Sequence, residues 1–234
     1  MKQQLTIDFL YEPEAQLSSF YASGNEVLIA SLQQLIQQQA NSHAQNLAFV
    51  HGPMGCGKSH LLQALCQYAD ELNVSAQYIP CKVVKQMPTE FTYGLEANEL
   101  LLIDDVDEFA LDGNWQRALF DLINRCLELE HKVIFAARLP ADAVGFNLPD
   151  LVSRLNWGQK WAIQPLNEQQ RQYMLQQRSE HRGIAMPDEL ASYIVLRCQQ
   201  DNASIIQCLD VLDQQSLAEK RKLTIPFVKS VMGW

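Results

Sequence analysis

The chain has 234 residues, of which 47% are hydrophobic and 19% are charged, so it can bury a sizeable core in one large or two small domains. Its formal net charge of −9 argues against this chain gripping DNA unaided, because duplex binding depends on neutralising phosphates. It carries no apolar run as long as a membrane span and no signal-peptide pattern, so we expect a cytoplasmic protein with reduced cysteines and no membrane contact.

Residues 1–15 read as an N-terminal tail. Within the tail, apolar side chains alternate with polar ones in the segment Gln4-Leu5-Thr6-Ile7-Asp8-Phe9, which indicates an extended segment with one apolar face. One interpretation is an edge strand of the chain's own domain. The other is a peptide that docks in a groove of another protein through Leu5, Ile7 and Phe9.

The first predicted helix follows Asn25, a residue type that often caps helices. Apolar residues at helical spacing predict its buried face, and they are Val27, Leu28, Leu32, Leu35 and Ile36.

The next feature is the segment Gly-Pro-Met-Gly-Cys-Gly-Lys-Ser at 52–59, which fits the phosphate-loop pattern G-x-x-x-x-G-K-[ST]. An apolar strand at 47–51 precedes it and a helix at 60–72 follows, an arrangement that aims a helix N-terminus at bound phosphates. Lys58 would reach the terminal phosphates, and the Ser59 hydroxyl would hold Mg²⁺. The predicted nucleotide-binding residues here are Gly52, Pro53, Met54, Gly55, Cys56, Gly57, Lys58, Ser59 and His60.

Cys56 has two interpretations. Its thiolate could be favoured in a loop that attracts anions, or it could be a small residue that simply fits the turn.

Four apolar residues and two carboxylates in Leu100-Leu101-Leu102-Ile103-Asp104-Asp105 are typical of a buried parallel strand. Its carboxyl end is where open α/β sheets place their ligands. We expect Asp104 to bind Mg²⁺ through water and Asp105 to polarise an attacking water. The alternative is that both carboxylates are solvated turn residues.

Further strands are predicted at 76–80, 133–137 and 161–163, and helices after Asp112 and Leu148. This alternation predicts a parallel three-layer αβα domain over residues 16–165. Four helices, beginning near Asn167, Pro187, Asp201 and Thr224, predict a small all-helical domain over 166–234. Such a lid beside a phosphate loop can press on a bound base.

The phosphate loop, the strand that ends in two aspartates and the helical lid together resemble the AAA+ ATPases, and within them the initiator clade around DnaA. Over nearly the whole chain the sequence is similar to the Hda family, DnaA-homologous proteins of regulatory inactivation of DnaA. Residues 148–158 are similar to the arginine-finger box of the clade, residues 222–229 are similar to Hda, and residues 4–9 are similar to peptides that dock on the sliding clamp.

The resemblance implies a negative regulator of replication initiation. Gln4, Leu5, Ile7 and Phe9 would dock on the DNA polymerase III sliding clamp (the beta subunit) loaded on DNA, and Arg154 would act in trans on the ATP of DnaA. The chain itself would hold a nucleoside diphosphate, ADP, with Mg²⁺. The base would pack against residues 17–21, which include Phe20 and Tyr21.

An alternative for Arg154 is a surface arginine paired with Asp150. Because full initiators of the clade carry a C-terminal helix-turn-helix domain that we do not recognise after the lid, we expect no direct DNA-binding domain. Docking on a symmetric clamp would favour homo-oligomers.

The chain departs from the family pattern at two positions that sense the γ-phosphate. A small polar residue is usual at the end of the strand at 133–137, where this chain has Ala136-Ala137-Arg138. An arginine is usual near the start of the third lid helix, where it has Asn202-Ala203-Ser204. We therefore expect weak hydrolysis of its own ATP. The rival interpretations are a self-hydrolysing ATPase motor or helicase loader, and an adaptor that nucleotide merely stabilises.

Overall fold

The computed structural model describes residues 15–38, 42–198 and 201–234. By internal contacts the chain divides into two units, Met1–Pro53 with Lys58–Ile163 and Met54–Gly57 with Gln164–Trp234. The predicted clamp-docking residues Gln4, Leu5, Ile7 and Phe9 lie outside the described part of the chain.

The first unit is built on a five-stranded parallel sheet with the strand order β2-β3-β4-β1-β5. Its inner strands are almost fully buried, because helices cover both faces of a parallel sheet. This confirms the predicted parallel αβα fold. In chain order the strands are β1 (Leu47–His51), β2 (Ala76–Pro80), β3 (Leu100–Asp104), β4 (Lys132–Ala137) and β5 (Gln159–Ala162).

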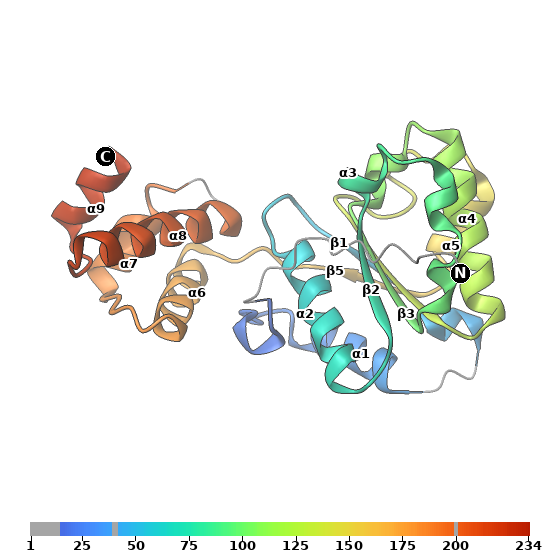
Figure 1. The fold of residues 1–234 in the computed structure, drawn as a ribbon, viewed down its shortest axis with the longest axis horizontal. Coiled ribbons are helices and arrows are strands. Elements are labelled where there is room, and N and C mark those ends of the chain that lie inside the picture. Colours follow the sequence, from blue (N-terminus) through green and yellow to red (C-terminus); the bar gives the residue numbers. More distant parts are fainter. Residues whose placement is uncertain (1–14, 39–41, 199–200) are drawn as a thin grey trace, which may run out of the picture. The chain divides into compact units, whose positions relative to one another are not determined.

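Helices pack on the two faces of this sheet (Figure 1), with α1 and α2 on one face and α4 and α5 on the other. Their bounds are α1 (Glu26–Gln37), α2 (Lys58–Glu71), α3 (Cys81–Val84), α4 (Gly113–Glu128) and α5 (Pro149–Leu155). Short 3-10 turns complete the unit: η1 (Leu17–Ser19), η2 (His43–Asn46), η3 (Thr89–Thr92), η4 (Leu95–Ala97) and η5 (Val106–Phe109).

Helix α1 corrects two details of the sequence reading. Val27 is 70% exposed and not part of the buried face, because it lies about 100° around the helix from Leu28 and off the stripe of buried residues. Asn25 precedes the helix as predicted, but its side chain makes no capping hydrogen bond.

The strand register brings several carboxyl ends to one edge of the sheet. His51 of β1 pairs with Ala137 of β4, and Ile103, one residue before the end of β3, pairs with Phe135. Just beyond β1, the Gly52 N–H donates to the Ala137 carbonyl at 3.2 Å. This edge therefore collects the phosphate loop and the two aspartates at 104 and 105.

The second unit contains the four predicted helices (Figure 1): α6 (Glu168–His181), α7 (Asp188–Val195), α8 (Asn202–Glu219) and α9 (Ile225–Met232). Side chains of Asn167, Asp201 and Thr224 cap α6, α8 and α9 by accepting backbone N–H bonds. Helix α7 begins directly after Pro187, as expected, and ends at Val195. In the described residues, every helix is too short or too polar to cross a membrane.

Candidate nucleotide-binding site

The phosphate loop leads from the end of β1 into the first residue of α2. Gly55 and Gly57 have φ angles of 75° and 103°, a left-handed conformation that other residues rarely adopt. Met54 is exposed, whereas the Cys56 side chain is buried. The turn thus needs the glycines at these two positions, which is the feature that lets backbone approach a phosphate closely.

Lys58 carries the positive charge of the loop. Its side chain is 6% exposed, and Nζ donates to the carbonyls of Gly52 at 2.8 Å and Pro53 at 2.9 Å. A buried ammonium needs such partners, because an isolated charge in the interior is costly. Held at the mouth of the loop, the ammonium fits the phosphate-binding role that the motif predicts for it.

Asp104 is the buried carboxylate at the end of β3, with 2% of its surface exposed. It accepts hydrogen bonds from the Tyr78 hydroxyl at 2.7 Å, from the Asp105 N–H at 2.9 Å and from the Ser59 hydroxyl. Burial and the neighbouring Asp105 charge raise the pKa of Asp104 above its usual value, against these hydrogen bonds. A nearby cation would favour the ionised form.

Ser59 and Asp104, the two predicted Mg²⁺ ligands, are therefore in contact. Within the described residues, no cluster of three or more His, Cys, Asp or Glu side chains is placed to hold a metal. This donor set suits Mg²⁺, which usually keeps several waters and binds one or two protein oxygens together with substrate phosphates.

Asp105, the predicted water-polarising residue, lies at the start of η5 in a left-handed backbone conformation with φ 52° and ψ 47°. Its carboxylate is 2.7 Å from Lys82 Nζ, and the resulting hydrogen bond raises the pKa of Lys82. Asp105 is thus a carboxylate whose charge is already partnered. Sequence reasoning missed Lys82 because the segment after β2, which forms the four-residue helix α3, shows no periodic pattern in the sequence.

The end of β4 places a second cation at the same edge. Ala136 and Ala137 are fully buried, so neither offers a polar group. The guanidinium of Arg138 forms an ion pair with Asp107 and lies 3.9 Å from Glu108, and the Asp107 hydrogen bond raises the pKa of Arg138. Lys85 pairs with Glu108 as well. The residue directly after β4 is therefore an arginine held in ion pairs.

The segment predicted to contact the base lies against the start of α2. The Phe20 ring stacks on the His60 ring with centroids 6.0 Å apart, and Ser19 Oγ is 3.3 Å from His60 Nε2. Tyr21, the residue that follows Phe20, is half-buried. The structure thus brings Phe20 and His60 together.

Arg154 lies in the last turn of α5. Its guanidinium is 4.5 Å from the centre of the Trp157 ring, which is 47% exposed. No carboxylate of the described residues pairs with it, so the alternative ion pair with Asp150 is not formed. Within the part of the chain that the structure describes, Arg154 is therefore a cation in contact with an aromatic face and in no ion pair.

The backbone after α5 is fixed by close packing. A Cβ at Gly158 would lie 2.1 Å from the Leu47 carbonyl oxygen, so only glycine fits at this position. The Trp157 ring also contacts the His43 ring edge-on, with the ring centroids 6.5 Å apart. Trp157 is therefore held where Arg154 can stack on it.

Two family models divide the chain between them. The model of the bacterial DnaA ATPase domain matches residues 17–162, and the model of the Hda lid domain matches residues 168–232. The chain belongs to the DnaA family of AAA+ proteins. Its lid places it with the Hda-like members of that family.

Solved DnaA structures share this fold. Domain III of Thermotoga maritima DnaA aligns with a TM-score of 0.81 at 18% identity, over 96% of this chain and 98% of that one. AMPPCP-bound DnaA from Aquifex aeolicus aligns with a TM-score of 0.72 at 20% identity, over 88% and 67%. The more distant RuvB branch migration motor of Thermotoga maritima gives 0.65 at 14% identity, over 90% and 68%.

Proposed function

We propose that this DnaA-family chain is a negative regulator of replication initiation that promotes hydrolysis of the ATP bound to DnaA. Arg154 is the residue that would act, in trans, on the partner's nucleotide. The observation that carries the proposal is the Arg154 guanidinium, which rests on Trp157 and has no carboxylate partner in the described residues. A guanidinium free of ion pairs can be offered to the charge that develops on a transferring phosphoryl group.

The chain's own site would hold ADP, and the fit rests on the loop geometry and on the contact of Ser59 with Asp104. Residues 52–60 would take the phosphates, Phe20 and Tyr21 would lie near the base, and Ser59 with Asp104 would hold Mg²⁺. When bound, the nucleotide would supply the negative charge of its phosphates to this site. The Lys82–Asp105 pair supports weak self-hydrolysis, since it engages the carboxylate that we expect to polarise the attacking water.

The tail would supply localisation. Gln4, Leu5, Ile7 and Phe9 would dock on the sliding clamp loaded on DNA, which raises the local concentration of the chain near DnaA. The support for this proposal is the alternation of apolar residues and its resemblance to clamp-docking peptides.

The test is ATP hydrolysis by DnaA in the presence of DNA-loaded clamp and the full chain. Arg154→Ala should lower the stimulated rate at least about 100-fold, because an arginine finger contributes three to five orders of magnitude in related phosphoryl transfer. Arg154→Lys should rescue little, since a point charge does not reproduce the planar guanidinium. An unchanged rate with Arg154→Ala would make the chain an adaptor without a catalytic part.

A second arm of the same assay changes Leu5 and Phe9 to alanine. The stimulated rate should fall when clamp is present and stay at the wild-type value when the clamp is left out. Wild-type clamp dependence in this variant would remove the tail from the proposal.

A further inference from the structure

The side chain of Gln116 forms hydrogen bonds both with η5, the turn that follows Asp105, and with the residues that lead into α5, the helix that carries Arg154. This glutamine lies in the first turns of α4 and is fully buried. A polar side chain in such a place must have its hydrogen bonds satisfied within the protein. Where those bonds go decides what the residue does.

The amide nitrogen of Gln116 binds the end of η5. Nε2 donates to the carbonyl of Phe109 at 3.2 Å and to the carbonyl of Ala110 at 2.7 Å. Turn η5 begins directly after Asp105, so these carbonyls lie one short turn from the carboxylates at the nucleotide site.

The amide oxygen of Gln116 binds the start of α5. Oε1 accepts from the N–H groups of Asn147 at 2.9 Å and Leu148 at 3.0 Å. Leu148 is the residue at which α5 begins, and Arg154 lies in the last turn of this seven-residue helix. Both donors would otherwise be unpaired backbone groups at the entry to a helix.

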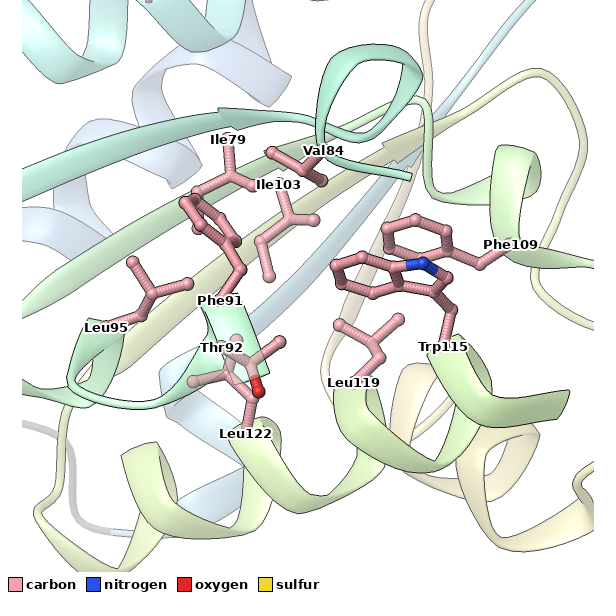
Figure 2. A pocket seen from close by; sticks show the side chains of 10 residues that line it. All are labelled: Ile79, Val84, Phe91, Thr92, Leu95, Ile103, Phe109, Trp115, Leu119 and Leu122. Atoms are coloured by element: carbon pink, nitrogen blue, oxygen red, sulfur yellow. The ribbon is translucent and has the colours of Figure 1, made fainter. Parts of the chain in front are cut away.

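The side chains of η5 and of the start of α4 are tightly packed around Gln116's neighbours. Figure 2 shows the rings of Phe109 and Trp115 lying face to face, with centroids 4.6 Å apart and planes 4° from parallel. The apolar cavity that these rings help to line has a volume of about 10 Å³. That is at the limit for a single water, so η5 and the start of α4 pack closely.

We propose that Gln116 is a positioning residue that couples the state of the chain's own nucleotide site, through η5, to the placement of α5 and therefore of Arg154. One planar amide uses both of its N–H groups on one element and its oxygen on the other. A movement of η5 is thus passed to α5 through this one side chain. This inference rests on the proposed function of Arg154.

A structural role alone would be the capping of α5 through the amide oxygen. Gln116→Glu separates the two roles, because its oxygens can still accept from Asn147 and Leu148 while a carboxylate cannot donate to the carbonyls of Phe109 and Ala110. Gln116→Leu removes both sets of bonds. Glu128→Ala is the matched control, an exposed position on the same helix.

The experiment measures DnaA ATP hydrolysis against the concentration of chain, with the chain either loaded with ADP or free of nucleotide. We expect Gln116→Glu and Gln116→Leu to bind ADP as the wild type does and to reach half-maximal stimulation at the same concentration. Their maximal rate should fall about tenfold, because a small misplacement of a catalytic group costs one to two orders of magnitude. The difference between ADP-loaded and nucleotide-free chain should disappear.

Wild-type maximal rate and nucleotide dependence in Gln116→Glu would overturn the inference and leave Gln116 as a cap of α5. Arg154→Ala in the same series distinguishes this failure from failure of the proposed function. An unchanged rate with Arg154→Ala would contradict both the proposed function and the coupling, whereas a reduced rate with Arg154→Ala and a wild-type rate with Gln116→Glu would contradict the coupling alone. Hydrogen exchange of the wild-type chain provides a test that needs no variant. Binding of ADP should change the protection of the Asn147 and Leu148 amides, and unchanged protection would contradict the coupling.

Discussion

Two charged regions of the first unit differ in how their charges are partnered. At the carboxyl edge of the sheet, Lys82 neutralises Asp105 and Arg138 neutralises Asp107. At the end of α5, the Arg154 guanidinium stacks on an aromatic ring and forms no ion pair with a carboxylate of the described residues. The contrast supports the proposal that this chain holds a nucleotide at one site and offers Arg154 to the nucleotide of a partner.

Among the variants that test this contrast here, we expect the largest effect on the hydrolysis rate from a change at Trp157. Trp157→Ala removes the face on which Arg154 is ordered, while the arginine itself is kept. Because cation–π contacts contribute about 0.5 to 2 kcal/mol, the stimulated hydrolysis by DnaA should fall about 2- to 30-fold. Trp157→Phe should keep most of the rate, as a smaller ring can still stack. Equal loss in both variants would mean that the indole acts in another way, such as by contact with the partner.

A smaller effect is expected at Lys82. Lys82→Ala frees the Asp105 carboxylate and should raise the chain's own ATP hydrolysis about 2- to 5-fold, the range that an exposed ion pair of up to about 1 kcal/mol allows. Lys85→Ala is the control, because Lys85 pairs with Glu108 instead. A single-turnover ATPase assay on the isolated chain measures both. Brisk turnover in the wild type, with no response to Lys82→Ala, would contradict the view that the site is restrained.

The smallest effect concerns His51, at the end of β1. Burial lowers the pKa of His51 below its usual 6.5, Lys58 adds to this effect, and Asp142 opposes it. The folded chain therefore binds fewer protons than the unfolded chain, so this contribution to stability is present above the usual pKa and is lost as pH falls through the folded one.

Between about pH 7.5 and about pH 5.5 the unfolding temperature should accordingly fall further in the wild type than in His51→Gln. His181→Gln, on the exposed side of α6, should follow the wild type. Parallel curves for all three proteins would contradict the lowered pKa of His51 in the folded chain.

Local patterns predicted the parts of the molecule that depend on short stretches of chain. The phosphate loop, the buried strand that ends at Asp104 and the capped helices of the lid each carry their signal within about ten residues. The prediction that Val27 lies on the buried face of α1 was wrong, because the spacing of apolar residues defines the edges of a buried helix face poorly.

The partners of the charged groups could not be predicted in the same way. Lys82 meets Asp105 across 23 residues of chain, and Gln116 meets Asn147 across 31. Both contacts depend on how strands and helices are placed in space, and Gln116 binds backbone groups that leave no trace in side-chain identity. The sequence therefore predicted a nucleotide site and a role for Arg154, but it did not predict the side chains that contact the groups around them.

The most direct test of the central claim follows a labelled phosphate. DnaA is loaded with γ-labelled ATP and the chain with unlabelled ADP, and release of labelled phosphate is followed in a single turnover in the presence of DNA-loaded clamp. The account predicts rapid release with the wild-type chain and a rate near that of DnaA alone with Arg154→Ala. Equal release with the two chains would contradict it.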